Sequence, residues 1–221
     1  MAQLLPFSPP AASNVAKSID LVFGIELACA TFVVVLIAGL MLYFSFRYRR
    51  RSHEETPPRI ATHNGLEVLW TTATFALFTF FFFMGAGLYV HIKKPLKNAQ
   101  EVYVVGKQWM WKIQHADGLR EIDELHVPVG QPIQLVMTSE DVIHDFFIPA
   151  FRLKMDVIPG SYTSEWFTAT EPGTYHLFCS QYCGMNHSLM VGHVIVLTQA
   201  DYNAWRAGLG PTITPAQSGR Q

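Results

Sequence analysis

Two long runs without a charged residue constrain the fold of this chain more than any other feature. The first, Leu27–Phe46 (LACATFVVVLIAGLMLYFSF), has 20 residues, and the second, Val68–Val90 (VLWTTATFALFTFFFFMGAGLYV), has 23. Because a helix rises about 1.5 Å per residue, each run can span the hydrocarbon core of a bilayer, which is about 30 Å thick. A helix in a soluble core rarely stays apolar on every face for so long. We therefore predict a transmembrane helical hairpin at 19–95, with helices at about 21–46 and 68–90.

Basic residues around the two runs predict the orientation of this hairpin. The linker holds five arginines, four of which follow the first run directly, and four lysines flank the hairpin outside the linker. The positive-inside rule therefore favours a cytoplasmic linker, with both chain ends on the other side, which is the periplasm in a bacterium. The Pro-, Ala- and Ser-rich segment 1–18 is expected to be irregular, and the polar tail 211–221 to be loosely ordered.

The second half of the chain has a different pattern. Runs such as EVYVVGKQWMWKIQ, PIQLVMTS and GHVIVLT are rich in β-branched and aromatic residues, and Gly and Pro separate them. Short strands at this spacing are typical of an all-β sandwich or barrel, which we expect at 96–210.

The charged residues of this β domain indicate which classes of partner it can bind. Residues 97–210 contain seven basic and twelve acidic residues, with acids clustered at 121–124 and 140–145. Most such acids form a solvated surface, and the alternative is a field that steers a basic protein partner. The chain lacks the basic stripe that nucleic-acid binding requires, so no nucleic-acid partner is expected.

One loop, CSQYCGMNHSLM, collects four soft metal-binding side chains in twelve residues. The spacing of Cys179 and Cys183 alone fits either a disulfide or a metal site. His187 and Met190 follow closely, and thiolate, imidazole and thioether together are the ligands that copper prefers. A mononuclear blue-copper site uses only one cysteine. The second thiolate therefore favours a centre in which two thiolates bridge two copper ions, each capped by one imidazole.

Such a centre needs a second histidine from outside the loop. Spacing does not choose among the five candidates, which are His115, His126, His144, His176 and His193.

These motifs resemble those of cytochrome c oxidase subunit II, the haem-copper oxidase subunit that carries the binuclear CuA centre. The resemblance covers nearly the whole chain and includes GKQWMWK, VMTSEDVIHDFFIP, LKMDVIPG and CSQYCGMNHSLMVGHVIV in the family's order. It implies a two-helix transmembrane hairpin followed by an all-β cupredoxin-like Greek-key domain. It also implies the copper ligands, which are the side chains of His144, Cys179, Cys183, His187 and Met190 and the backbone carbonyl of Gln181.

The resemblance further implies roles for residues outside the ligand set. Trp109 matches the aromatic residue through which electrons enter from cytochrome c, whereas Trp111 fits a core position. Glu140 and Asp141 match acidic positions of the docking face for that donor. Glu67 matches a carboxylate near the cytoplasmic mouth of a proton path, although an acid in a first helical turn is also explained by the helix dipole.

By the same resemblance, Lys154 and Asp156 match a segment that faces the large catalytic subunit. Many family members have Glu where this chain has Gln181, and that carboxylate reaches a magnesium or manganese ion shared with subunit I. The shared Mg/Mn site therefore lacks its carboxylate here, while a backbone copper ligand is unaffected.

The resemblance implies a subunit in the inner membrane of a bacterium, with the CuA domain on the periplasmic side. It would accept electrons from cytochrome c and pass them to haem in subunit I, which with the other oxidase subunits reduces O2 to water coupled to proton transfer. No Cys-x-x-Cys-His motif occurs, so the cytochrome c is expected to be a separate molecule. Two alternatives stay open: the CuA subunit of a haem-copper nitric oxide reductase, and a membrane-tethered copper electron carrier. A quinol oxidase subunit II would lack the ligands.

Overall fold

The computed structural model describes residues 8–56, 62–95 and 97–208. The chain divides into two compact units, one of Asp20–Val90 and one that combines Met1–Ile19 with His91–Gln221. The tail predicted at 211–221, the first seven residues and the linker residue Arg59 lie outside the described residues.

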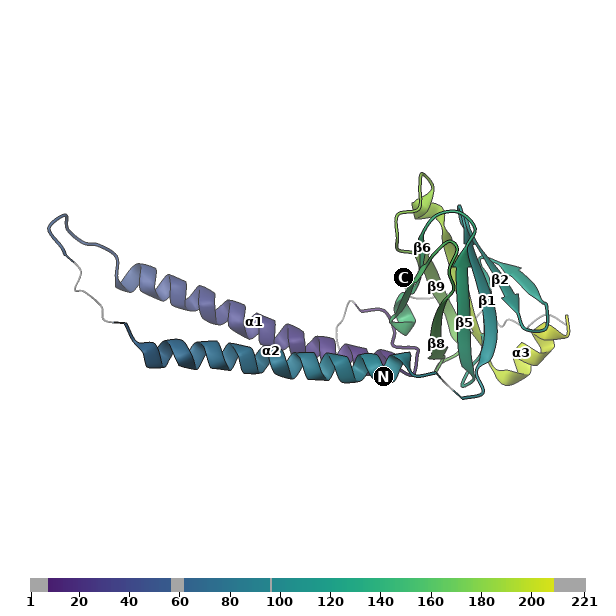
Figure 1. Cartoon of the computed structure of the whole chain (residues 1–221), viewed down its shortest axis with the longest axis horizontal. Helices are drawn as coiled ribbons and strands as arrows, with labels where there is room; N and C mark the ends of the chain where they lie inside the picture. The colour runs from purple at the N-terminus through teal and green to yellow at the C-terminus, as the bar shows by residue number, and fades with distance from the viewer. Residues whose placement is uncertain (1–7, 57–61, 96, 209–221) are drawn as a thin grey trace. The chain divides into compact units, whose positions relative to one another are not determined.

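Two long helices account for the apolar runs. Helix α1 spans Ala16–Arg47 and helix α2 spans Asn64–Lys93, and the chain turns back between them (Figure 1). Both are long and apolar enough to cross a membrane, and most of their side chains are exposed. Both helices extend beyond the boundaries of 21–46 and 68–90, because helical hydrogen bonding continues into the polar flanks of each apolar run. At the start of α1, for example, the Ser13 hydroxyl accepts a hydrogen bond from the Ala16 N–H at 3.2 Å.

The second unit is a sandwich of two five-stranded sheets (Figure 1). One sheet has the order β3-β2-β1-β5-β8 and the other β4-β10-β9-β6-β7. The strands are β1 (Gln100–Lys107), β2 (Met110–His115), β3 (Arg120–Ile122), β4 (Glu124–Pro128), β5 (Pro132–Ser139), β6 (His144–Ile148), β7 (Leu153–Val157), β8 (Thr163–Thr168), β9 (Gly173–Cys179) and β10 (Val191–Leu197).

The core lies between the two sheets because the strands alternate in burial. Every second residue of β5 is buried, as the period of two in a pleated strand requires. Trp111 on β2 is fully buried and meets Phe146 of β6 edge-on, with ring centroids 5.1 Å apart, so the prediction that Trp111 is a core residue is confirmed. Helix α3 (Gln199–Arg206) follows β10 and carries Trp205 over His126, with the two rings stacked at 4.4 Å.

Candidate metal centre

The cysteine-rich loop connects two neighbouring antiparallel strands. Cys179 is the last residue of β9, and Met190 directly precedes β10. The loop is closed at its base, because the Cys179 N–H donates to the Met190 carbonyl at 3.2 Å. A short 3-10 helix, η2 (His187–Leu189), folds the second half of the loop back toward its start. Strand pairing therefore brings the two ends of the motif together.

The two loop cysteines are close but not bonded to each other. Their Sγ atoms lie 3.6 Å apart, well beyond the 2.03–2.05 Å of a disulfide, and both are free thiols. Two thiolates can contact one metal ion when their sulfurs are within about 4.6 Å, twice a metal–thiolate bond of about 2.3 Å. The sulfur separation therefore fits a shared metal.

Each thiol has its own imidazole neighbour. The Nδ1 atom of His144 lies 3.9 Å from the Sγ of Cys179, and the Nδ1 atom of His187 lies 3.5 Å from the Sγ of Cys183. Met190 places its Sδ 3.8 Å from the Cys183 sulfur. The strand pairing of β6 with β9, which sets Phe146 opposite Cys179, explains why a histidine so distant in sequence reaches the loop.

A backbone oxygen completes the cluster. The Gln181 carbonyl lies 3.2 Å from the Cys179 sulfur, while the Gln181 side chain is exposed. The two cysteines, His144 and Met190 are all buried, and only His187 is partly open to solvent. A buried set of two thiols, two imidazoles, a thioether and a carbonyl has the ligand chemistry that suits copper.

The two thiols have opposite pKa shifts. Burial would raise the pKa of the Cys179 thiol, but the hydrogen bonds that it makes, chiefly with His144, outweigh burial and lower the pKa to about 7. Burial and the adjacent Cys179 raise the pKa of the Cys183 thiol to about 12. Without a positive ion, the pair therefore favours one thiolate and one thiol, because two neighbouring negative charges repel each other.

His144 is fixed in place from three sides. Its Nε2 donates to the Asp141 carboxylate at 2.8 Å, which leaves Nδ1 toward Cys179. Trp111 meets the imidazole edge-on at 5.9 Å. On another side lies Gly106, where an added Cβ would come within 2.9 Å of the ring carbon Cδ2. A carboxylate behind a ligating histidine sets its tautomer and ring orientation.

Two acidic residues that the sequence analysis assigned to an acidic surface cluster instead hold the site together. Partial burial would raise the pKa of Asp141, but hydrogen bonds from the Gln108 N–H, the His144 ring and the Val142 N–H bring it to about 2. Asp145 is buried and accepts a hydrogen bond of 2.7 Å from the Ser180 hydroxyl, at the start of the loop.

The other four candidate histidines do not contact the loop thiols among the described residues. His115 and His126 both hydrogen-bond the buried carboxylate of Glu121. Burial would raise the pKa of Glu121, but these two histidines lower it below its ordinary value of 4.5. The remaining two, His176 and His193, face each other across β9 and β10 with ring centroids 5.4 Å apart.

Trp109 lies against the loop. It follows β1 and is partly buried, and a Cβ added to Gly184 of the loop would come within 3.3 Å of its indole ring. The neighbouring Gln108 side chain donates to the Cys183 carbonyl at 2.8 Å. Gly184 has a φ of 120°, so glycine is required there both by the backbone and by the close indole.

The remaining predicted site residues lie outside the cluster. Glu140 forms ion pairs with Lys112 at 2.8 Å and Lys107 at 3.3 Å, so two cations offset its charge. Hydrogen bonds from these lysines lower the pKa of Glu140. Glu67 lies exposed in the first turn of α2. Asp156 and Lys154 lie on β7, the edge strand beside β6.

Sequence reasoning missed Gly106, Gln108 and Asp145 as parts of the site. A glycine inside the alternating run EVYVVGKQWMWKIQ was a signal, because a strand glycine often marks a close approach by another group. Asp145 next to His144 gave no such signal, since its buried side chain is explained only by the hydrogen bond to Ser180.

Comparison with known proteins relates both units to one family. Residues 2–83 match the cytochrome c oxidase subunit II transmembrane domain, and residues 101–198 match the cytochrome c oxidase subunit II periplasmic domain. A cytochrome c oxidase subunit 2 of Thermostichus vulcanus is 31% identical over 252 aligned positions, covering 90% of this chain and 77% of the relative. The chain belongs to the cytochrome c oxidase subunit II family.

Two further relatives match about half of the chain. A heme-copper oxidase subunit 2 of Aeropyrum pernix is 40% identical over 127 residues, covering 55% of this chain and 54% of the relative. The crystal structure of the periplasmic domain of a cytochrome oxidase subunit II from Bradyrhizobium japonicum is 29% identical, covers 52% of this chain and 94% of that one, and has a TM-score of 0.49.

Family membership confirms the predicted fold class, a transmembrane helical hairpin followed by an all-β cupredoxin-like domain. As a subunit II, the chain is a membrane protein with a CuA-type soluble domain and is part of an oxidoreductase complex. The family implies copper, and the His144, Cys179 and Cys183 group fits that metal.

Proposed function

We propose that this chain is the subunit through which electrons enter a haem-copper cytochrome c oxidase. The chain would hold a binuclear CuA centre that takes electrons from cytochrome c and passes them to haem in subunit I, where O2 would be reduced to water with coupled proton transfer. One observation carries this proposal: two thiols lie 3.6 Å apart, and each has a different imidazole beside it. A mononuclear copper carrier would need only one of these cysteines.

The ligands follow from the cluster. Cys179 and Cys183 would hold the two metals as shared thiolate ligands, and His144 and His187 would each supply an imidazole ligand. Met190 and the Gln181 carbonyl are the remaining, weaker ligands. When bound, the copper pair supplies a centre that changes its charge by one electron. The residues of the chain supply the rest of the function, which is a rigid, dry and correctly oriented site.

Rigidity is what the surrounding residues provide. Asp141 holds the His144 ring, Gln108 holds the Cys183 carbonyl, and the Ser180–Asp145 hydrogen bond anchors the first turn of the loop. A site whose ligands cannot move has little to reorganise when its charge changes, so electron transfer is fast. The buried thiols also keep water away from the metals.

Electrons enter beside Trp109 in this proposal. Its indole packs on Gly184 of the loop, which gives a short covalent and van der Waals path to Cys183. The loop also exposes three large apolar side chains, Tyr182, Met185 and Leu189, each at least 73% accessible. Exposed apolar groups of this kind are suited to a transient protein partner. Glu140 and Asp141 belong to the proposed docking face for cytochrome c, although their charges are already engaged by Lys112 and His144.

The membrane arrangement is part of the proposal. The arginine cluster after α1 supports a cytoplasmic linker, which puts the copper domain on the periplasmic side of a bacterial inner membrane. Subunit I would then accept electrons from the face that carries Lys154 and Asp156. Glu67, near the linker end of α2, would lie on the cytoplasmic side, where a proton path opens. With Gln181 in place of a carboxylate, we expect no Mg or Mn ligand from this position.

The test is anaerobic stopped-flow mixing of reduced cytochrome c with the copper-loaded full chain in detergent, without other subunits. We expect one electron to leave cytochrome c for each chain, because two coppers share one redox change. Cys183→Ser is the matched control and should accept no electron at this rate. Equal oxidation of cytochrome c by the full chain and by Cys183→Ser would show that the cluster does not receive the electron.

A further inference from the structure

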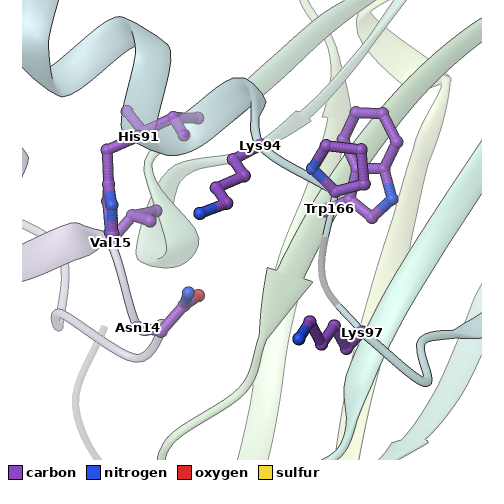
Figure 2. Close-up of a pocket in the computed structure, with 8 residues that line it drawn as sticks. Asn14, Val15, His91, Lys94, Lys97 and Trp166 are labelled. Carbon is purple, nitrogen blue, oxygen red and sulfur yellow. The ribbon is translucent and has the colours of Figure 1, made fainter.

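A small basic cavity lies where the chain passes from α2 to the β domain. Its volume is about 220 Å³, and it is lined by residues of the N-terminal segment, the end of α2, the segment between α2 and β1, and strand β8. Figure 2 shows the ammonium groups of Lys94 and Lys97 and the amide of Asn14 directed into the same space, with His91 and Trp166 at its sides.

Chain continuity places this cavity at the boundary of the membrane. His91 directly follows Val90, the last residue of the second uncharged run, so the cavity begins where the hydrocarbon core ends. Tryptophan side chains favour this depth, because an apolar ring with one polar N–H suits the headgroup region. Trp166 of β8 is the aromatic wall of the cavity.

The three lysines at and just after the end of α2 differ in whether they form ion pairs. Lys93 forms an ion pair of 2.7 Å with the buried carboxylate of Glu165. Within the described residues, Lys94 and Lys97 have no acidic partner, although the domain as a whole has an excess of acids. Two unpaired ammonium groups therefore face one cavity.

The side chain of Asn14 adds a hydrogen-bond donor that is directed into the cavity (Figure 2). Its side-chain oxygen accepts a hydrogen bond of 3.0 Å from the Thr168 N–H, which fixes the orientation of the amide. The amide nitrogen has no partner among the described residues and is left with two hydrogens to donate. Two cations and an amide donor surround one space whose lining includes no acidic side chain, which is suited to an anion.

We propose that this cavity binds a phosphate group, and that its occupant is the phosphodiester of an anionic phospholipid in the outer leaflet. Lysine binds phosphate as a point charge, and phosphodiesters are the abundant anions at this depth. The cavity is smaller than the 300–1,000 Å³ of typical small-molecule sites, so it holds a headgroup while the acyl chains stay in the bilayer. The bound lipid ties the base of the copper domain to the membrane surface.

The test is native mass spectrometry of the delipidated full chain in non-ionic detergent, titrated with phosphatidylglycerol or with phosphatidylcholine of the same acyl chains. We expect tighter binding of phosphatidylglycerol. The double variant Lys94→Gln/Lys97→Gln should weaken that binding about 30-fold, from about fivefold for each lysine near a membrane anion. Both side chains are exposed, so the fold should persist, and near-ultraviolet circular dichroism checks this.

The matched control is Lys107→Gln/Lys112→Gln, which removes the same charge elsewhere on the same domain and should leave lipid binding unchanged. Equal binding of the two lipids, or equal losses in the two double variants, would overturn the proposal. A separate titration of the lipid-free chain with inorganic phosphate, followed by ³¹P nuclear magnetic resonance, shows whether the bound phosphate group comes from a lipid or from free phosphate. Saturable phosphate binding that needs Lys94 and Lys97, without a preference between the lipids, would assign the cavity to soluble phosphate and refute the lipid assignment.

Discussion

Substitution of Asp141 is the most specific test of how the fold positions the proposed copper ligands. The Asp141 carboxylate accepts hydrogen bonds from the Gln108 N–H at 2.7 Å, the Val142 N–H at 2.7 Å and the His144 ring at 2.8 Å. Asp141→Ala removes all three at once and leaves the imidazole without its carboxylate hydrogen-bond partner, held by Trp111 and Gly106. Loss of such a partner behind a metal-ligating histidine typically lowers metal affinity 10–100-fold, about 1.4–2.8 kcal/mol.

The assay is a competition titration for copper between the full chain and a chelator of known affinity. Asp141→Asn keeps one oxygen acceptor and should lose less affinity than Asp141→Ala. Asp117→Ala is the matched control, because it removes a carboxylate that pairs with Arg206 instead of a ligand. The reasoning is refuted if Asp141→Ala stays folded and binds copper within about twofold of the unsubstituted chain.

Three further substitutions test separate parts of the account. Gly106→Ala brings a Cβ within 2.9 Å of the His144 ring, so it should weaken copper binding and cost about 1–3 kcal/mol of stability in denaturant titrations; unchanged copper affinity would contradict this. Trp109→Ala should keep near-normal copper content but accept electrons from cytochrome c much more slowly. Normal stopped-flow rates in this variant would show that Trp109 only packs against the loop. Folding lowers the pKa of Glu121, so its carboxylate stabilises the domain fully above pH 4.5 and loses this contribution as the pH falls below that value. Glu121→Gln should therefore flatten the decline of unfolding free energy below pH 4.5, and an unaltered decline would oppose that reading.

The membrane helices were the most predictable part of the fold. Their signal is length and the absence of charge, which needs no knowledge of distant contacts. The helices themselves, Ala16–Arg47 and Asn64–Lys93, continue past the apolar runs, because apolar composition marks a membrane-spanning stretch and not the ends of a helix. The alternating strands were predictable for a similar local reason, as the burial of every second residue in β5 shows.

The candidate site was predictable only in part. The loop residues are close in sequence, so Cys179, Cys183, His187 and Met190 could be grouped, but spacing could not separate a disulfide from a metal site. The partner histidine could not be chosen from spacing, because His144 reaches Cys179 only through the pairing of β6 with β9.

The acidic residues were the hardest to interpret. Asp141, Asp145 and Glu121 look like solvated surface charges in sequence, yet each carboxylate is held by hydrogen bonds. Several of their partners, such as Gln108, His115 and Ser180, lie on other turns or strands, so composition does not reveal them. Counting charges therefore describes the net charge of the domain but not which carboxylates are solvated and which are held by hydrogen bonds.

The most direct test of the central claim is the number of coppers and how they share an electron. We would load the full chain with copper in detergent and measure the copper-to-protein ratio together with the electron paramagnetic resonance spectrum. The account predicts two coppers per chain that share one unpaired electron, and loss of this spectrum in Cys179→Ser and in Cys183→Ser. One copper per chain with the electron confined to it, or an unchanged spectrum in both variants, would contradict the binuclear centre.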